Sequence, residues 1–450
     1  MNNEKLKRGL TLTHAISIVI GSIIGTGVFL KTATMTQFLG HPYLVLLAWF
    51  IGGLLSLAGA LTYAELGTLV NKSGGEFEYL KQSFGNFVAF LFGWMRFWIG
   101  SPGAIAAYAV GAMTFLNSFY SLEKFGGKKI CAIFVIILFS LINCLKVSMA
   151  GKIQSFLTFL KIFIILLLGL GIFFYTPNSN IFLTNIYLPL KSNPFTISAF
   201  ASALLASLWA YDGWNNLSMV SGEIIDPAKN IPKALSFGVF GVFLIYGFIN
   251  LSYFYALPIS EIVNSNSKLY PDSLPVATKA GLSFLGNGGL KFISIAFILS
   301  ALGAMNGSIL TGSRVPYAMA NEGLFFMSIK KISHKNSVPV MSIFVQGVIA
   351  SLLSISGTFD QLTDYVVFAA WIFYALVTAS IFKYRKLSPI EMRSKNHYRI
   401  YGYPFIPILF IFVAFGLLVN TIYTSPMESG IGLLFILSGV PFYFYFKNSL

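Results

Sequence analysis

Gly21-Ser22-Ile23-Ile24-Gly25-Thr26-Gly27-Val28-Phe29 decides how this chain folds, because it places three glycines within seven residues of an apolar segment. Glycine has no β-carbon and adopts backbone dihedrals that other residues avoid. Taken alone, the stretch leaves two interpretations open. The spacing of Gly21 and Gly25 is typical of close packing between membrane helices. An unwound segment, by contrast, is tolerated in a membrane only where it lines a protected cavity.

The composition places the whole chain in a bilayer. Of its 450 residues, 56% are hydrophobic and only 10% are charged, which is more apolar surface than a soluble fold buries. Apolar segments of about 20 residues, long enough to cross a hydrocarbon core of roughly 30 Å, recur along the chain. The sequence therefore predicts an all-α membrane protein with twelve transmembrane helices. The expected spans are 12–30, 43–69, 86–115, 129–146, 153–175, 196–221, 234–257, 288–312, 338–355, 361–382, 403–421 and 430–446.

Positive charge predicts the orientation. Most of the 30 Lys and Arg residues fall in the N-terminal tail and in the loops after even-numbered helices, which is the pattern of cytoplasmic segments. We therefore expect a multi-pass protein of the cell (inner) membrane with both termini in the cytoplasm. The net charge of +15 indicates topology and attraction to anionic headgroups, so it gives no support to nucleic-acid binding. The densest group is Lys383, Arg385, Lys386, Arg393, Lys395 and Arg399.

A second unusual stretch changes the interpretation of the first. Trp209-Ala210-Tyr211-Asp212-Gly213-Trp214-Asn215-Asn216 places a carboxylate, two amides and a glycine in the sixth expected span. A charge inside a membrane helix costs about 2.5–3.5 kcal/mol on insertion scales, so it normally faces a cavity or a partner. The two stretches lie five helices apart. Interrupted helices at matching positions of two halves indicate the binding site of a transporter.

Such a site suits a zwitterion. A helix beginning near Thr26 and Gly27 would present free N–H groups and partial positive charge to a carboxylate. A helix ending near Trp209 would present free carbonyl groups to an ammonium group. One α-amino acid could bridge both, with its side chain toward Asp212 and Asn215.

Several motifs resemble the L-type amino acid transporter family of the amino acid-polyamine-organocation superfamily. They are Gly25-Thr26-Gly27-Val28-Phe29, Thr62-Tyr63-Ala64-Glu65-Leu66-Gly67, Ser73-Gly74-Gly75-Glu76, Tyr211-Asp212-Gly213-Trp214-Asn215, Gly222-Glu223-Ile224-Ile225-Asp226-Pro227, Asn230-Ile231-Pro232 and Asn306-Gly307-Ser308. The likeness is greatest to bacterial serine/threonine or alanine/serine/cysteine exchangers. It implies one leucine-transporter-like domain over 1–450. The domain would hold inverted five-helix repeats at 12–175 and 196–382, discontinuous helices 1 and 6, and two peripheral helices at 403–446.

The resemblance also implies site residues. The substrate carboxylate would lie on the amides of Thr26 and Gly27, and the ammonium on the carbonyls of Ile23, Trp209 and Asp212. Trp209 matches an aromatic outer gate. Asp212 replaces a glycine of many relatives and would either contact a cationic or polar side chain or pin the unwound segment. The remaining expected binding residues are Gly25, Asn215 and Asn306. For Asn306 a second interpretation stays open, in which it bridges helices by hydrogen bonds.

Lys161, about eight residues into the fifth span, resembles a lysine whose ammonium occupies the position of a sodium ion in sodium-coupled relatives. The implication is sodium independence. Two mechanisms stay open: a permanently charged strut in an exchanger, or a buried lysine that carries a coupled proton.

The expected function is sodium-independent L-amino acid transport, as an exchanger of small or neutral amino acids. A proton-coupled symporter, which could take cationic or polar substrates, and a non-transporting sensor are the alternatives. No enzyme activity, cofactor or metal is expected, because His14, His41, His334 and His397 form no ligand spacing. Residues 117–129 contain no cysteine to link a heavy subunit, so no such partner is expected.

Several other charges have two interpretations. Glu65, Glu76 and Glu78 could close an inner gate with basic residues or be solvated charges at helix ends. Glu223 and Asp226 are expected to shape the loop after the sixth helix. Arg96 is expected to reach the cytoplasmic interface with its long side chain. Cys131 and Cys144 are expected to be packing residues, since both lie in one span.

Overall fold

The computed structural model of the chain describes residues 6–70, 72–117, 119–176, 180–187, 196–270, 273–286, 288–356, 359–387 and 397–448, and within these the side chains of 356, 359–367 and 428 are not described. Every named element in this part of the chain is helical. One isolated parallel bridge joins Leu10 to Ile224. Of the basic group expected after the tenth helix, Arg393 and Lys395 lie outside the described residues.

The described residues of the first half of the chain form nine α-helices and two short turns of other helix types. They are α1 (Leu12–Ile23), α2 (Gly27–Leu39), α3 (Pro42–Leu69), α4 (Glu76–Phe84), α5 (Asn86–Met95), a π-helical turn (Arg96–Gly100), α6 (Ser101–Asn117), a 3-10 turn (Glu123–Phe125), α7 (Gly127–Asn143), α8 (Val147–Tyr175) and α9 (Asn180–Ile186).

The second half continues in the same way. Its helices are α10 (Ile197–Ala210), α11 (Asn216–Met219), α12 (Pro227–Ala256), α13 (Ile259–Val263), α14 (Val276–Leu285), α15 (Gly288–Gly312), α16 (Arg314–Asn321), α17 (Val340–Ser356), α18 (Phe359–Leu387), α19 (Phe405–Thr424), α20 (Pro426–Leu437) and α21 (Gly439–Asn448), with 3-10 turns at Ser221–Glu223 and Met327–Lys330.

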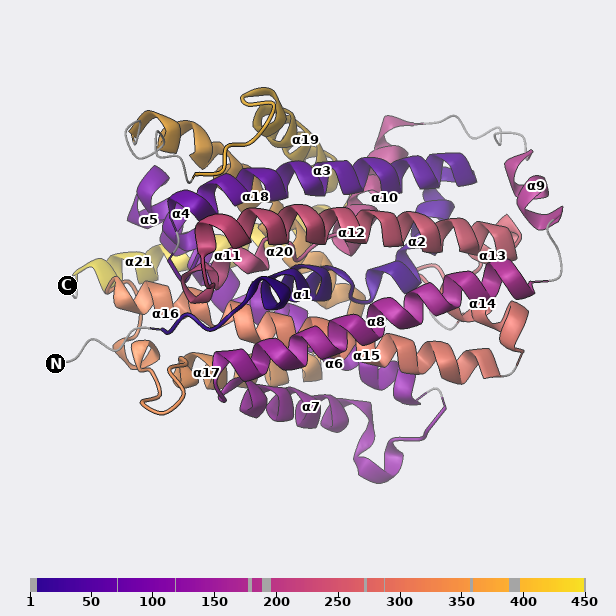
Figure 1. Cartoon of the computed structure of the whole chain (residues 1–450), viewed down its shortest axis with the longest axis horizontal. Helices are drawn as coiled ribbons and strands as arrows, with labels where there is room; N and C mark the ends of the chain where they lie inside the picture. The colour runs from indigo at the N-terminus through magenta and orange to yellow at the C-terminus, as the bar shows by residue number, and fades with distance from the viewer. Residues whose placement is uncertain are drawn as a thin grey trace.

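The long helices lie side by side along the long axis of the molecule (Figure 1). Helix α12 packs against α3, α1 and α8, while α15 packs against α6 and α8, and α10 packs against α2. The short helix α1 is therefore surrounded by longer helices, and the break that follows it lies inside the bundle. The start of the described chain and α21 lie at the same end of the body.

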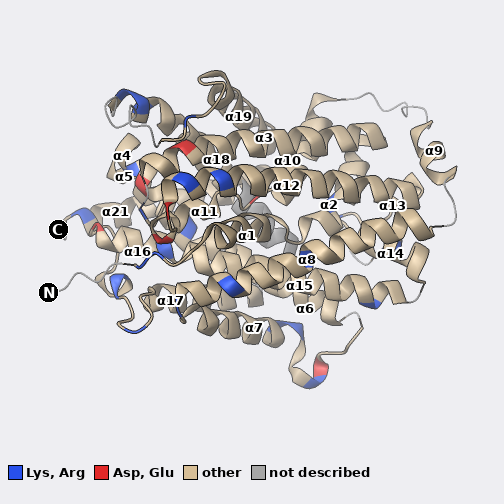
Figure 2. Ribbon diagram, viewed as in Figure 1, with Lys and Arg blue, Asp and Glu red and all other residues tan. Residues whose placement is uncertain are grey.

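Charge is distributed unevenly along the long axis. Most Lys, Arg, Asp and Glu residues, blue and red in Figure 2, lie at the end that holds both termini, around α4, α11, α16 and α21. Few lie along the middle of the body. Many large apolar side chains are exposed on the outside of the long helices, such as Phe159, Phe163 and Phe412 at 71%, 55% and 73%. An apolar belt between charged ends is what a bilayer requires.

Eight segments among the described residues are long and apolar enough to cross a membrane by length and composition. The expected span 288–312 coincides with α15, and 43–69 with nearly all of α3. The expected span 12–30 is two helices, because the chain unwinds after Ile23 and then stays helical past Lys31 to Leu39. The expected span 196–221 is likewise interrupted, between α10 and α11.

Local sequence signals fix the first of these helices. Thr11 is the N-cap of α1 and forms a capping box with His14, in which the Thr11 hydroxyl accepts from the His14 N–H and the His14 ring accepts from the Thr11 N–H. Gly40 ends α2 with a φ of 62°, a left-handed conformation that favours glycine. These signals set where α1 begins and where α2 ends.

Candidate functional site

The first break joins α1 to α2 through Ile24, Gly25 and Thr26. The first N–H groups of α2 have no acceptor within that helix and carry its partial positive charge. The hydroxyl oxygens of Ser22 and Thr26 are both buried and have no hydrogen-bond partner. Unpaired buried polar atoms are rare in folded proteins, so their presence at this break fits a polar ligand.

The second break joins α10 to α11 through Tyr211–Asn215. Gly213 adopts a φ of 111°, and a β-carbon there would lie 2.9 Å from the backbone carbon and oxygen of Ser22. Gly27 is equally confined, since its β-carbon would lie 2.6 Å from the β-carbon of Ala210. The glycines that sequence reasoning singled out therefore bring the two breaks into direct contact.

Tyr246 of α12 ties the two breaks together, and sequence reasoning missed it. Its hydroxyl lies 3.0 Å from the carbonyl oxygen of Ile23 and 2.9 Å from that of Ala210, and can donate its proton to either. Its ring packs against the rings of Trp49 and Tyr211, with centroids 5.3 and 5.0 Å away. A tyrosine within an apolar span gives no signal of its own, so only the fold reveals this contact.

Lys161 of α8 points at the first break. Its ammonium donates to the carbonyl oxygens of Gly21, Ile24 and Ser300 at 2.9, 2.6 and 2.9 Å. The side chain is 1% exposed. An ammonium group has three protons to donate, and here each has a carbonyl acceptor. The Lys161 amine group thus lies among three backbone carbonyl oxygens, between the unwound chain and α15.

Asp212 in the second break accepts a hydrogen bond from the Tyr374 hydroxyl at 2.7 Å. Of the two roles expected for Asp212, this contact matches the structural one, because it fixes the unwound segment to α18. Trp209, the expected gate, is 8% exposed in the last turn of α10. Its carbonyl accepts from the Asp212 N–H at 3.1 Å.

Asn215 connects the second break to a buried acid. Its amide donates to Glu76 at 3.2 Å, and the Tyr63 hydroxyl donates to the other carboxylate oxygen of Glu76 at 2.9 Å. Glu76 is fully buried at the start of α4, outside the apolar spans, and this burial raises its pKa to about 7. Of the two interpretations of Glu76, the solvated charge is wrong, because the carboxylate lies inside the protein.

Arg96 differs from its expected position. It is 7% exposed at the start of the π-helical turn, and it donates to the Asn216 side chain at 3.0 Å instead of extending to an interface. The Arg96 Nε atom is buried without a partner. This contact could not be predicted from the sequence, because Asn216 lies 120 residues further along the chain. Single π-helical turns are frequent at functional sites.

Asn306 lies on α15, and its side chain forms hydrogen bonds to two neighbouring helices. Its amide donates to Gln154 at 2.7 Å, and its oxygen accepts from Asn143 at 2.9 Å. These bonds join α15 to α8 and α7. The structure thus places the predicted residues Ile23, Gly25, Thr26, Gly27, Trp209, Asp212, Asn215 and Lys161 at the two breaks, and places Asn306 in a polar cluster between neighbouring helices.

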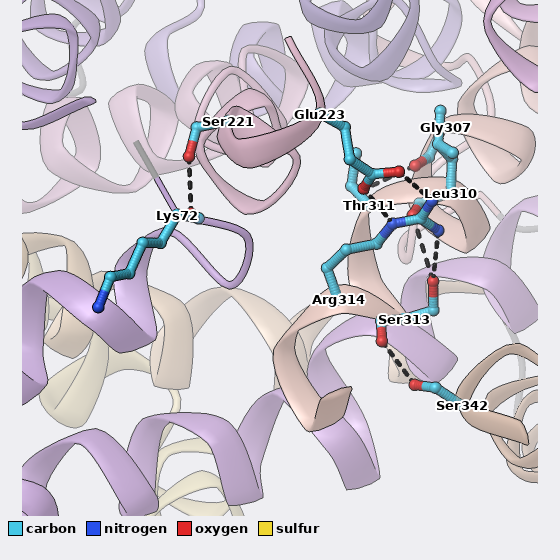
Figure 3. Close-up of polar contacts among 9 residues, drawn as sticks. All are labelled: Lys72, Ser221, Glu223, Gly307, Leu310, Thr311, Ser313, Arg314 and Ser342. Carbon is cyan, nitrogen blue, oxygen red and sulfur yellow. Dashed lines mark hydrogen bonds and ion pairs between the residues drawn. The ribbon is translucent and has the colours of Figure 1, made fainter. Parts of the chain in front are cut away.

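Buried ion pairs fasten the end of the molecule that holds both termini. Glu223 and Arg314 form a bidentate pair at 2.8 and 3.0 Å, with both side chains fully buried (Figure 3). The backbone carbonyl of Glu223 accepts from the N–H groups of Gly9 and Leu10 at 2.9 and 3.0 Å. Glu223 therefore does more than shape its loop, because it joins the N-terminal segment to the start of α16.

A second pair fastens α18 at the same end. Arg385 donates to both carboxylate oxygens of Glu65 at 2.8 and 2.7 Å, and the backbone N–H of Ile400 donates to Glu65 at 2.8 Å. Glu78 is 4% exposed and lies 3.9 Å from Lys72. Glu65, Glu76 and Glu78, the three acids that could have been solvated, are therefore all buried.

Cys131 and Cys144 are free thiols. Among the described residues, no cluster of His, Cys, Asp or Glu could hold a metal ion.

Comparison with known proteins adds the family. The amino acid permease family matches residues 10–444. The chain is 32% identical over 449 residues to the serine/threonine exchanger SteT of Bacillus subtilis, covering 98% of both chains. It is 31% identical over 448 residues to the human cystine/glutamate transporter, covering 98% of this chain and 86% of that one. It is 30% identical over 462 residues to the mouse b(0,+)-type amino acid transporter 1, covering 99% and 89%.

These matches run through both helix breaks and extend almost from one end of the chain to the other. The relatives are transporters and not enzymes, in agreement with the site, where unwound backbone and not a catalytic set is assembled. The chain belongs to the amino acid permease family and is an L-type-like amino acid transporter of the amino acid-polyamine-organocation superfamily.

Proposed function

We propose that this protein is a sodium-independent exchanger of small or neutral L-amino acids that works by alternating access. The observation that carries the proposal is the meeting of two helix breaks, where the start of α2 contacts the end of α10 through Gly27 and Ala210. This arrangement fits twelve transmembrane helices with inverted repeats at 12–175 and 196–382, in which α1–α2 and α10–α11 are the discontinuous first and sixth helices.

In this proposal the substrate carboxylate binds the N–H groups of Thr26 and Gly27. The unpaired Thr26 hydroxyl supplies a further donor at the same place. The ammonium binds the carbonyls of Ile23, Trp209 and Asp212. The Tyr246 hydroxyl lies within reach of both the Ile23 and the Ala210 carbonyls, so it can donate to Ala210 when the ammonium occupies Ile23. Substrate binding would then change the hydrogen bond of Tyr246 and so affect α12, the helix that carries this residue.

One feature supports a small substrate, and a second supports a neutral one. A β-carbon on Gly25 would lie 3.0 Å from the ring of Tyr108, so this side of the first break has little free space. The carboxylate of Asp212 already accepts a hydrogen bond from Tyr374, which leaves it fewer acceptor positions for a cationic side chain of a substrate. We assign Trp209 as the outer gate, since it lies in the last turn of α10, directly before the second break.

Lys161 supports sodium independence. Unwound carbonyls are the groups that coordinate Na⁺ in transporters with broken helices. Here the Lys161 ammonium already binds carbonyls of Gly21, Ile24 and Ser300, so a second cation at this place would be repelled. A permanent charge that braces the first break suits an exchanger, because the binding step then needs no coupling ion.

Proton-coupled symport is the second candidate, and Glu76 favours it. Its pKa of about 7 lets the carboxyl group exchange a proton near neutral pH, and Asn215 connects it to the second break. Symport predicts concentrative uptake driven by an imposed pH gradient in the absence of internal substrate. Exchange predicts no such uptake.

The proposal is tested by reconstituting the purified chain alone into liposomes. Labelled amino acid uptake is measured from a panel of amino acids, with and without internal unlabelled substrate, sodium and a pH gradient. We expect uptake of a small neutral amino acid that requires internal substrate and is indifferent to sodium. Substrate binding without uptake under any condition would instead identify a sensor.

The same preparation tests the expected independence from a heavy subunit. Residues 117–129 contain no cysteine for a disulfide link, so the chain alone should be active. We also propose the cell (inner) membrane as its location, with both termini in the cytoplasm. This orientation is supported by the concentration of charge at the end that holds both termini (Figure 2).

A further inference from the structure

A cavity of about 860 Å³ opens at the N-terminal end of α12, away from the two helix breaks. Its lining comes from three parts of the chain that are distant in sequence. Arg8 comes from the N-terminal segment, Lys229 and Lys233 come from the first two turns of α12, and His397 comes from the segment that follows α18. The cavity thus lies where the N-terminal segment, α12 and the approach to α19 meet.

The cavity is strongly basic. Arg8, Lys229 and Lys233 are exposed, and none of the three forms an ion pair with another residue that the structure describes. Asp226 is the one acidic residue among the described residues of the lining. The first turn of α12, which begins at Pro227, adds the partial positive charge of a helix N-terminus. The Nδ1 atom of His397 is buried and has no hydrogen-bond partner. Together these groups favour an anion.

The basic end continues into an apolar stripe on the same helix. Lys229, Lys233 and Phe237 are spaced by four residues, so they share one face of α12. Along that face, the side chains of Phe237, Phe240 and Leu244 are 63%, 48% and 54% exposed. Helix α12 is one of the eight segments able to cross a membrane. A free phosphate ion could use only the basic end, whereas a phospholipid could use both parts.

We propose that this cavity binds an anionic phospholipid, with its phosphate between Arg8, Lys229 and Lys233 and an acyl chain along Phe237, Phe240 and Leu244. Basic pockets at the membrane surface of helical proteins suit such headgroups. This inference does not depend on which amino acid the protein carries.

The bound headgroup would connect the N-terminal segment to α12. Arg8 is followed by Gly9 and Leu10, which bond to the Glu223 carbonyl. His397, on the other side of the cavity, precedes Ile400, whose N–H bonds to Glu65. A lipid phosphate that holds Arg8 to α12 therefore adds a contact to the end of the molecule where these two buried acids lie.

Lipid binding is measured by native mass spectrometry of the detergent-solubilised protein titrated with dioleoylphosphatidylglycerol. Lys229→Gln/Lys233→Gln is compared with Lys152→Gln/Lys330→Gln, which removes the same charge from exposed lysines outside the cavity. Each lysine near an anionic headgroup contributes about a fivefold gain in affinity, so the first pair should weaken binding about thirtyfold. The control pair should change it little, and Lys229→Arg/Lys233→Arg should retain it.

Three further arms identify the ligand, with gel filtration and circular dichroism confirming that each variant is folded. Dioleoylphosphatidylcholine should bind far more weakly, because its headgroup has no net charge. Inorganic phosphate and glycerol phosphate should fail to displace the lipid, because they lack acyl chains. Displacement by either at equal concentration would overturn the proposal in favour of a free-phosphate site. Equal losses in the two double variants would overturn it in favour of unspecific charge attraction. Neither outcome bears on amino acid counterflow.

Discussion

Lys161 is the residue on which the coupling mechanism depends most. Its ammonium satisfies three carbonyls at once, one from α15 and two from the end of α1. Removing the ammonium takes a donor away from three buried carbonyl groups, of which that of Ile24 keeps the Ser300 hydroxyl at 3.0 Å. A buried carbonyl that is left unpaired costs about 1–3 kcal/mol. We therefore expect Lys161 to hold the first break in its unwound form.

Lys161→Ala should reduce counterflow by at least tenfold, because the carbonyls of Gly21 and Ile24 would shift and carry the amides of α2 with them. Lys152→Ala is the matched control, since Lys152 is an exposed lysine on the same helix. Initial rates of labelled substrate uptake into preloaded liposomes give the comparison. Unchanged transport in Lys161→Ala would remove this residue from the mechanism.

Glu76 makes a testable contribution to pH dependence. Burial raises its pKa from 4.5 to about 7, so between these values the folded protein holds a proton that the unfolded chain releases. Stability from this group is therefore greatest below pH 4.5 and is lost as the pH rises to about 7. The loss amounts to roughly 3 kcal/mol, because each pKa unit corresponds to about 1.4 kcal/mol.

Glu76→Gln should flatten the fall in melting temperature between pH 5 and pH 8, since the amide stays neutral throughout. Glu123→Gln, at an exposed glutamate in a loop, should retain the fall. Thermal unfolding in detergent at closely spaced pH values measures both. The same pH profile in Glu76→Gln and the wild type would show that Glu76 does not titrate in this range.

The two broken helices show what sequence can reveal about an element. Glycine-rich and polar residues inside apolar runs predicted both breaks, because they are costly in an ordinary membrane helix. The partners across the breaks were not predictable. Tyr246 and Arg96 bond to groups that are distant in sequence, and their own spans do not indicate these partners. Hydropathy also ended the first span at 30, although the helix continues past Lys31 to Leu39.

Gly213→Ala tests the contact between the breaks. The φ of 111° is strained for alanine by about 1–3 kcal/mol, and the new methyl group would meet the backbone of Ser22. We expect counterflow to fall at least tenfold. Gly247→Ala on α12, where a β-carbon has no neighbour within 4 Å, should transport normally. Normal transport by Gly213→Ala would show that the breaks need not touch as they do here.

At the scale of the whole molecule, buried charges secure the end that holds both termini. The Glu223–Arg314 pair is fully buried and links the segment after α11 to α16 (Figure 3). The sequence contained both residues, but a charge on one helix does not indicate its partner 91 residues away. This is why Glu223 was expected only to shape a loop.

Glu223→Gln should lower stability by about 3–5 kcal/mol, because it leaves the Arg314 charge buried and uncompensated. Glu261→Gln breaks a pair with Lys279 in which the Glu261 side chain is 57% exposed, so it should cost less than about 1 kcal/mol. Thermal unfolding of both variants in the same detergent makes the comparison. Similar small losses in the two variants would show that the Glu223–Arg314 pair does not secure this end.

The central claim, exchange of amino acids without sodium, is tested most directly by counterflow. The purified chain is placed in liposomes loaded with an unlabelled small neutral amino acid, and labelled uptake is followed in sodium-free buffer at equal internal and external pH. The account predicts rapid uptake in loaded liposomes, little uptake in empty ones, and the same rate when sodium is added. Uptake in empty liposomes that appears only with a sodium gradient, or no uptake of any amino acid, would contradict it.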